Sequence, residues 1–195
     1  MSYVFTRRFF VTAFILLLSA CTSVPKMPGD AYSKAARDYL YGLQLWHFEG
    51  RLAISSPKDA WSANADWRHS GNSENLNLSG PLGQGAVAVE LADGVVKIDR
   101  GGGNVQSSDQ PERFISQQVG LFVPLESLRF WVVGLPDSAQ DFQETTDGFV
   151  QAGWLVEYKT MQKSAGQVMP QKMIVSKDRL KLKLIIDQWD LQGFK

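Results

Sequence analysis

The residue with the clearest chemistry is Cys21, the only cysteine of the chain. With the preceding Leu18-Ser19-Ala20 it matches the lipobox, a cleavage pattern whose cysteine becomes the first residue of the mature protein. Arg7 and Arg8 supply a positive segment, and residues 9–18 form a short apolar run. Such a run is too short to cross a bilayer comfortably and is typical of a cleaved signal peptide. The thiol of Cys21 is therefore the predicted site of lipid attachment.

A second interpretation of Cys21 stays open, because Ala20 also fits an ordinary cleavage site and a cysteine can follow one by coincidence. A lone cysteine cannot form an intramolecular disulfide, so an exported chain gains little from an unmodified thiol. A diacyl group plus a palmitate-type chain on the new amino terminus exceeds the two membrane signals that stable anchoring needs. Thr22, not an aspartate, follows the cysteine. In bacteria that use an aspartate as a retention signal, this predicts the outer membrane.

No other set of residues has the pattern of a catalytic, metal or cofactor site. His47 and His69 lack further ligands at a metal-binding spacing, and we expect both on the solvent side of strands. The glycines within 80–85 do not follow the order of a dinucleotide fingerprint, and no P-loop lysine follows them. Carboxylate pairs such as Asp137 and Asp141 occur in any soluble protein, and there is no G-x-S-x-G elbow. We predict neither an enzyme nor a cofactor.

Charge and length limit the remaining functions. The chain has 20 basic and 20 acidic residues, and removal of residues 1–20 takes away two arginines, which leaves a net charge of about −2. This chain lacks the dense basic surface that nucleic-acid binding needs. The residues after the signal suffice for one domain, which we place at 30–195. Residues 21–29 contain Pro25 and Pro28 and are predicted to be a flexible tether.

The domain begins with a predicted helix and continues as short strands. Asp30 is a suitable N-cap, and apolar residues at helical spacing follow it to about Leu45. From Trp46 the period changes to two, and Gly50 interrupts the first strand as a bend or bulge. Further strands are expected at 61–68, around 76–78, at 86–91 and at 95–99, with Asp93-Gly94 as a hairpin turn.

The middle of the chain is predicted to be helical, at 110–119 and at 125–133, with Gly134 and Pro136 ending the second helix. Strands resume at 142–145, 154–158, 173–176 and 180–186. The fold class is therefore mainly β with helices. Antiparallel sheets with one solvent-exposed face tend to curve into a barrel or half-barrel. The central helices are the natural cover for its apolar concave side, and a barrel of this size can hold a small apolar ligand.

Large aromatic residues face that predicted interior, and their role has two interpretations. They are Trp46, Phe48, Trp61, Trp67 and the pair Phe130-Trp131. In the first interpretation they fill a solid core, which is the commoner use because proteins have few pockets. In the second they line a cavity that stays partly open for a ligand.

Leu82 is an unusual residue for its loop, which spans Gly80 to Gly85. It lies between a proline and a glycine, where turn chemistry favours polar residues. Either it folds back onto the core, or it projects outward and meets something apolar. Burying one leucine is worth only about 1.5–3 kcal/mol. That is too little to anchor a protein but enough to probe a membrane already held close by Cys21.

Several segments together resemble the LolB family of outer-membrane lipoproteins. They are the lipobox ending at Cys21, the strand 46–54, the loop Ser79-Gly80-Pro81-Leu82-Gly83, the segment 123–136 (VPLESLRFWVVGLP), Met169-Pro170 and the ending 182–189. The segment 123–136 is the most specific of these, and the resemblance covers nearly the whole mature chain. One departure is Gly80, where family members carry asparagine before the proline.

This resemblance implies a fold, a role and partners. The fold is an incomplete antiparallel β-barrel of the LolA/LolB kind, covered by a helical lid over an apolar cavity. The role is to accept the acyl chains of lipoproteins from a LolA-like periplasmic carrier and release them into the outer-membrane bilayer, with Leu82 tied to release. We expect a lipid-anchored monomer on the periplasmic face. The residues we assign to the acyl-chain cavity are Trp46, Phe48, Leu52, Ile54, Trp61, Trp67, Leu76, Leu78, Leu128 and Trp131.

Two other functions stay open at this point. A structural envelope lipoprotein would have a filled core and would bind no acyl chain. A membrane-tethered hydrolase would need a polar cluster in a cleft, for which the sequence offers no motif. The interior beneath residues 125–133 is the feature that separates these hypotheses.

Overall fold

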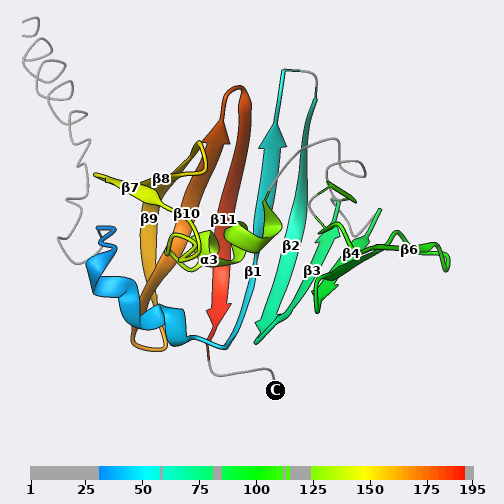
Figure 1. Ribbon diagram of the computed structural model, residues 1–195, viewed down its shortest axis with the longest axis horizontal. Helices are drawn as coiled ribbons and strands as arrows, with labels where there is room; N and C mark the ends of the chain where they lie inside the picture. The colour runs from blue at the N-terminus through cyan, green and yellow to red at the C-terminus, as the bar shows by residue number, and fades with distance from the viewer. Residues whose placement is uncertain (1–30, 58, 81–84, 112, 115–123, 192–195) are drawn as a thin grey trace, which may run out of the picture.

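The computed structural model describes residues 31–57, 59–80, 85–111, 113–114 and 124–191, which form one antiparallel sheet with helices on one side (Figure 1). The helices are η3, a 3₁₀ helix at Ala35–Gly42, and α3 at Leu125–Val132. The strands are β1 Leu45–Ser55, β2 Ala60–Ser70, β3 Ser73–Ser79, β4 Val87–Ala92, β5 Val95–Asp99, β6 Val105–Ser108, β7 Phe142–Thr145, β8 Gly148–Gln151, β9 Trp154–Ser164, β10 Gln167–Lys177 and β11 Leu180–Asp190.

The strand order explains why a helix lies over the sheet. The order is β6-β5-β4-β3-β2-β1-β11-β10-β9-β8-β7, so two meanders meet where β1 pairs with β11. The chain leaves the first meander at one edge, β6, and enters the second at the other edge, β7. It must therefore return across a face of the sheet, and it carries α3 on the way. Figure 1 shows α3 over the central strands.

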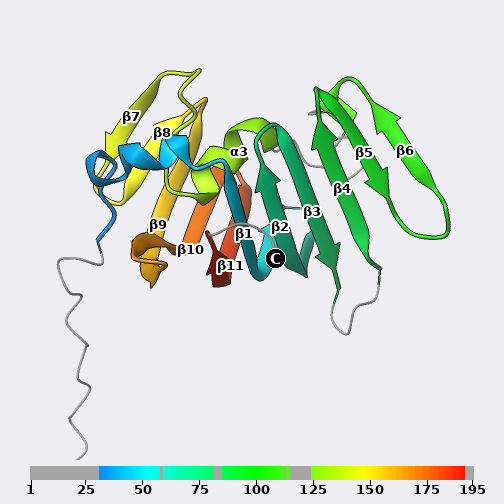
Figure 2. The ribbon, with the colours of Figure 1, turned by 90° about the horizontal axis from the view of Figure 1, so that it is seen from below.

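The sheet curves without closing into a barrel. β6 and β7 are its two edges, and within the described residues they do not pair with each other. In Figure 2 the outer strands at both ends rise on the side where α3 lies. The sheet is thus a trough that holds α3 on its concave side, which we call the inner face. The predicted incomplete antiparallel barrel with a helical lid is confirmed.

A bulge in the central strand pair keeps apolar side chains on the inner face. The register between β1 and β11 shifts between Glu49 and Gly50. β11 has one extra residue there, so its alternation changes and both Ile186 and Trp189 are buried. A Cβ at Gly50 would lie 2.3 Å from the carbonyl oxygen of Ile185, so only glycine fits. The predicted irregularity at Gly50 is confirmed.

Arg37 of η3 holds the C-terminal end of α3. Its side chain is 3% exposed, and its Nε donates to the carbonyl oxygen of Gly134 at 3.3 Å. Its Nη groups donate to the carbonyl oxygens of Val133 and Val168. Burial lowers the pKa of the guanidinium. Gly134 has φ +91°, and a Cβ there would collide with the Arg37 side chain. The predicted helix end at Gly134 is confirmed.

Trp131 ties α3 to the second meander. Its indole Nε1 donates to Gln151 Oε1 at 2.8 Å, and its carbonyl oxygen accepts a hydrogen bond from the Tyr158 hydroxyl at 2.7 Å. Its ring is 0% exposed and lies 6.2 Å from the ring of Trp154. The lid is therefore fixed by directional bonds as well as by apolar packing.

Four elements differ from the sequence prediction. The first helix is shorter than expected and is 3₁₀, which places Arg37 and Leu40 on one face, and both are buried. β6 and β8 were not predicted, since each has four residues and neither shows the apolar alternation of a half-buried strand. Of the predicted helix 110–119, residues 111, 113 and 114 are helical, residue 110 is not, and residues 112 and 115–119 lie outside the described residues.

Candidate functional site

The ten residues predicted to line the cavity lie together in the described structure. Across the sheet, Phe48 pairs with Trp67 and Trp67 with Leu76, and six residues further along β1, Ile54 pairs with Trp61. Paired residues of neighbouring strands share a face. All ten belong to the apolar core or pack against it. They nevertheless divide into two groups by exposure.

One group is fully packed. Trp46, Phe48 and Trp67 are 1–2% exposed and meet Trp189 and His69 in a single aromatic cluster. The ring centroids of Phe48 and Trp189 are 5.3 Å apart in an edge-on arrangement. Ile54, Leu128 and Trp131 are also buried. These six side chains fill space within the protein.

The other group is only half-buried and includes Leu52, Trp61, Leu76 and Leu78. Between them the inner face carries small residues, since Leu52 pairs with Ala63 and Gly50 pairs with Ala65. We call Leu52, Trp61, Ala63, Leu76 and Leu78 the open region. Little side-chain volume stands on the strands here, while the bordering side chains are apolar and retain exposed surface.

A contrasting set of residues lies on β8, β9 and β10, next to the C-terminal end of α3. We call these residues the packed region, and all are 0–2% exposed: Phe149, Trp154, Val156, Tyr158, Met173 and Val175. Tyr158 also stacks on Tyr32 with ring centroids 4.4 Å apart. Burial raises the pKa of the Tyr158 hydroxyl well above its usual value, and it raises that of Tyr32 as well.

A buried carboxylate on the inner face was missed by sequence reasoning. Glu74 is 1% exposed and accepts a hydrogen bond from Trp67 Nε1 at 2.8 Å. His69 Nδ1 lies 2.7 Å from its other oxygen, and Arg129 Nη1 lies 3.9 Å from that same oxygen. The signal was available, because Glu74 has the same strand parity as Leu76. Both carboxyl oxygens therefore have hydrogen-bond partners, as burial requires.

The expectation that His69 faces solvent is wrong. His69 is 8% exposed and its ring stacks on Trp46 at 5.1 Å. β2 extends to Ser70, so His69 continues the inward series of Ala65 and Trp67. Its polar nitrogen is accommodated there by Glu74.

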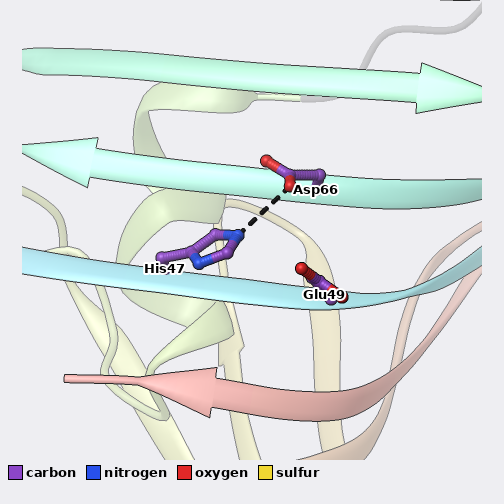
Figure 3. A group of neighbouring side chains, drawn as sticks. All are labelled: His47, Glu49 and Asp66. Carbon is purple, nitrogen blue, oxygen red and sulfur yellow. Dashed lines mark ion pairs between the residues drawn. The ribbon is translucent and has the colours of Figure 1, made fainter. Parts of the chain in front are cut away.

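The outer face of the sheet carries a group of potential metal ligands, shown in Figure 3. His47 and Glu49 come from β1 and Asp66 from β2, with ligand atoms within 4.8 Å of one another. Asp66 Oδ2 lies 3.3 Å from His47 Nε2 and 3.0 Å from Arg68 Nη2. Because the guanidinium already supplies positive charge to Asp66, we describe the group as ion pairs and assign no metal to it.

The most connected polar cluster is also structural. Ser127 Oγ donates to Asp137 Oδ2 at 2.9 Å, and Gln140 Nε2 donates to both residues. Gln151 Nε2 donates to the carbonyl oxygens of Asp137 and Gln140. Each polar group thereby has a partner, and the cluster holds the chain that follows α3 against β8.

Cys21 and Leu82 lie outside the described residues, so their predicted roles stay predictions. The described neighbours of Leu82 are Gly80 and Gly85, and Gly85 has φ +63°. Within the described ranges, neither helix is long and apolar enough to cross a membrane.

Comparison with known proteins adds a family and a fold. The family model described as "Outer membrane lipoprotein LolB" matches residues 44–189. An outer-membrane lipoprotein LolB from Pseudomonas fluorescens is 31% identical over 197 residues, covering 95% of this chain and 96% of that protein. One from Marinomonas is 32% identical over 190 residues, covering 93% and 96%.

Two solved structures share the fold at low sequence identity. A LolA superfamily protein from Nitrosomonas europaea has a TM-score of 0.51 and 9% identity, covering 83% of this chain and 93% of its own. A DUF1329 family protein from Desulfovibrio piger has a TM-score of 0.50 and 11% identity, covering 85% and 95%. These likenesses support the open antiparallel sheet alone.

Proposed function

Because this chain belongs to the LolB family of outer-membrane lipoproteins, we propose that it accepts the acyl chains of other lipoproteins from a LolA-like periplasmic carrier and releases them into the outer membrane. It is an outer-membrane lipoprotein of the lipoprotein localisation pathway, anchored by lipid in a Gram-negative bacterium. Its family is one of transport proteins and is not a known enzyme class.

The observation that carries the proposal is the open region of the inner face. Half-buried apolar side chains border the small residues Ala63 and Ala65, on the concave side of an unclosed sheet. A hydrocarbon chain in water costs about 0.8 kcal/mol per CH₂ group. A surface that shelters such a chain without covalent chemistry therefore needs apolar area that the protein has not filled with its own side chains.

Transfer in this mechanism needs no chemical step. Acyl chains move forward when the receiver's apolar surface binds them better than the carrier's does. Release follows because the bilayer core is a still better solvent for them. Binding spread over many apolar side chains contacts only the lipid part of the cargo, so cargo proteins of different sequence can be accepted.

The proposal assigns a role to each part of the chain. Residues 1–20 are the signal peptide, 21–29 are the lipidated N-terminus and tether, and 30–195 are one binding domain that acts as a monomer. Cys21 carries the anchor. Leu82 lies in the connection between β3 and β4 and contacts the bilayer during release.

Acyl binding can be measured on the chain from residue 21 onward carrying Cys21→Ser. We expect it to bind a fluorescent fatty-acyl probe and to take an acylated lipoprotein from the carrier. A chain that folds but does neither would be a structural envelope lipoprotein, which is the alternative function.

The release step can be tested separately with Leu82→Glu. A carboxylate on the loop disfavours insertion into the bilayer but leaves the inner face unchanged. We expect nearly normal acyl uptake and impaired delivery to liposomes, with Leu82→Ile as the matched control. Equal delivery by the Glu variant and the parent would remove this loop from the mechanism.

A further inference from the structure

A groove of about 560 Å³ lies opposite the lid, across β10, β11, β1 and β2. Its basic lining residues are Lys172, Lys181 and Lys183. The rest of the lining consists of the small residues Ala53, Ser55, Ala60 and Ser62 and the apolar residues Ile54, Trp61 and Ile174. The register explains the shape, because Lys181 pairs with Ser55 and Lys183 with Ala53. Long basic side chains on β10 and β11 thus stand beside short ones on β1 and β2.

Several other charges of this face form ion pairs. Arg51 Nη2 lies 2.8 Å from Asp187 Oδ1, and Glu157 bonds Lys159. The three groove lysines make no ion pair within the described residues. Like charges close together on neighbouring strands repel one another and are destabilising. A cluster of unpaired lysines therefore raises the local affinity for anions.

The lysines are graded in distance from one end of the sheet. The β1–β2 and β10–β11 hairpins lie at that end (Figure 1), and the ends of β3 and β4 that flank Leu82 point the same way, since Ser79 pairs with Asn64. Lys181 follows the β10–β11 turn by one strand residue. At roughly 3.4 Å per residue, Lys183 is about 7 Å further along and Lys172, opposite Ile185, about 14 Å.

We propose that this lysine groove binds the phosphate groups of anionic lipids, so that the hairpin end of the sheet faces the bilayer. This inference rests on the proposed function in one respect. The proposed contact of Leu82 with the bilayer is what places the membrane at the hairpin end of the sheet. The lipid anchor fixes the protein near the membrane but does not orient the domain, and the lysines supply orientation. Each lysine close to an anionic surface raises the affinity of the protein for that surface about fivefold. The attraction decays over about one Debye length, roughly 8 Å at physiological salt.

The distance grading separates a lipid surface from an acidic protein partner. A partner lying along the groove would contact all three lysines, so each would contribute similarly. A bilayer at the hairpin end reaches Lys181 and Lys183 but not Lys172. Lysine-to-glutamine changes should therefore weaken binding in the order 181, 183, 172.

The test is co-sedimentation with lipid vesicles of the chain from residue 21 carrying Cys21→Ser. One set of vesicles contains zwitterionic lipid only, and the other contains the same lipid with about 30% phosphatidylglycerol as a model of an anionic bilayer. We expect tighter binding to the anionic vesicles, lost at high salt. Lys181→Gln should reduce it about fivefold, Lys183→Gln about twofold and Lys172→Gln less than about 1.5-fold.

The control is a triple Lys→Gln variant at Lys34, Lys97 and Lys163, which removes the same charge elsewhere. Lys34 and Lys97 make ion pairs, and Lys163 lies in β9 near the opposite end of the sheet. Equal loss for this control and for a triple Lys→Gln variant of the three groove lysines would overturn the proposal, and so would equal loss for the three single groove variants. Binding to anionic vesicles without acyl uptake would refute the receptor function but support lipid binding by the lysine groove. Acyl uptake without preference for anionic vesicles would support the receptor function and refute lipid binding by the groove.

Discussion

The packed region and the open region belong to one sheet and differ in how completely their side chains are buried. Tyr158 in the packed region is 1% exposed, and its hydroxyl is bonded to the lid. Leu78 in the open region is half-buried and has Ala65 as its neighbour on β2. Both places consist of paired antiparallel strands. The difference shows that tight side-chain packing can stabilise one part of the inner face, the packed region, while another part, the open region, keeps apolar surface exposed.

The contacts of α3 explain this division. Arg37, Gln151 and Tyr158 bond the C-terminal part of the lid to η3, β8 and β9. These bonds are buried, where an unmet partner costs about 1–3 kcal/mol. We therefore expect this part of the lid to stay in place when a ligand binds.

The largest effect should come from Trp131→Ala, in the lid where it contacts the packed region. The side chain is 0% exposed and donates to Gln151, so removal should lower the free energy of unfolding by about 3–5 kcal/mol. Urea denaturation measures this. Leu76→Ala in the open region should cost clearly less, and equal costs for the two variants would mean that both regions are equally packed.

The next effect is a loss of stability at alkaline pH. Burial raises the pKa of Tyr158 above the unfolded value near 10. Below pH 10 both states keep the proton. Above it the unfolded state releases a proton that the folded state retains, so stability falls by about 1.4 kcal/mol per pH unit until the folded pKa is reached.

Tyr158→Phe isolates that contribution. It loses the hydrogen bond to Trp131 at every pH but removes the titrating group, so its stability should fall less steeply above pH 10. Denaturation between pH 8 and about 11 gives the slopes. Parallel slopes for parent and variant would contradict a buried phenol at this position.

Filling the open region should reduce acyl binding without loss of stability. Ala63 is half-buried on the inner face and opposite Leu52. We expect Ala63→Phe to occupy the proposed site and weaken binding of a fatty-acyl probe about tenfold, equivalent to about 1.4 kcal/mol. Ala88→Phe, at an exposed position of β4, is the control.

The outcome of Ala63→Phe also tests the comparison itself. In a solid interior, an added ring costs about 1–3 kcal/mol of stability. Marked destabilisation with unchanged probe binding would show that the open region is ordinary core.

The smallest effect should come from removing one apolar contact. Leu78→Ser takes hydrocarbon from the open region, and we expect probe affinity to fall about fivefold. Val105→Ser makes a similar change at a side chain that is 56% exposed, and it should have no effect. Probe titration by fluorescence distinguishes them, and equal losses would disconnect Leu78 from the ligand.

Local rules predicted the turns and helix ends well. Asp93 and Gly94 have φ +50° and +76°, as a tight hairpin turn requires. Gly134 ends α3 in a left-handed conformation. These features depend on the conformational range of one or two residues, so the local sequence is sufficient to predict them.

The buried polar residues could not be predicted as easily. Arg37, Glu74 and Gln151 are residue types that usually lie at the surface. Each is buried because partners from distant segments meet it, such as Trp67 and His69 at Glu74 or Trp131 at Gln151. Sequence alone does not reveal such partners, because they become neighbours only when strands pair.

By itself the sequence determined the lipobox at Cys21, the alternation of short strands, the helix 125–133 and the resemblance to a lipoprotein family, because these are properties of neighbouring residues. Only the tertiary structure decided which predicted cavity residues are packed and which stay half-exposed. It also brought the three groove lysines together on the outer face. The physical reason is that exposure and charge clustering depend on strand register and on the return of the chain across the sheet, which set contacts between residues far apart in the chain.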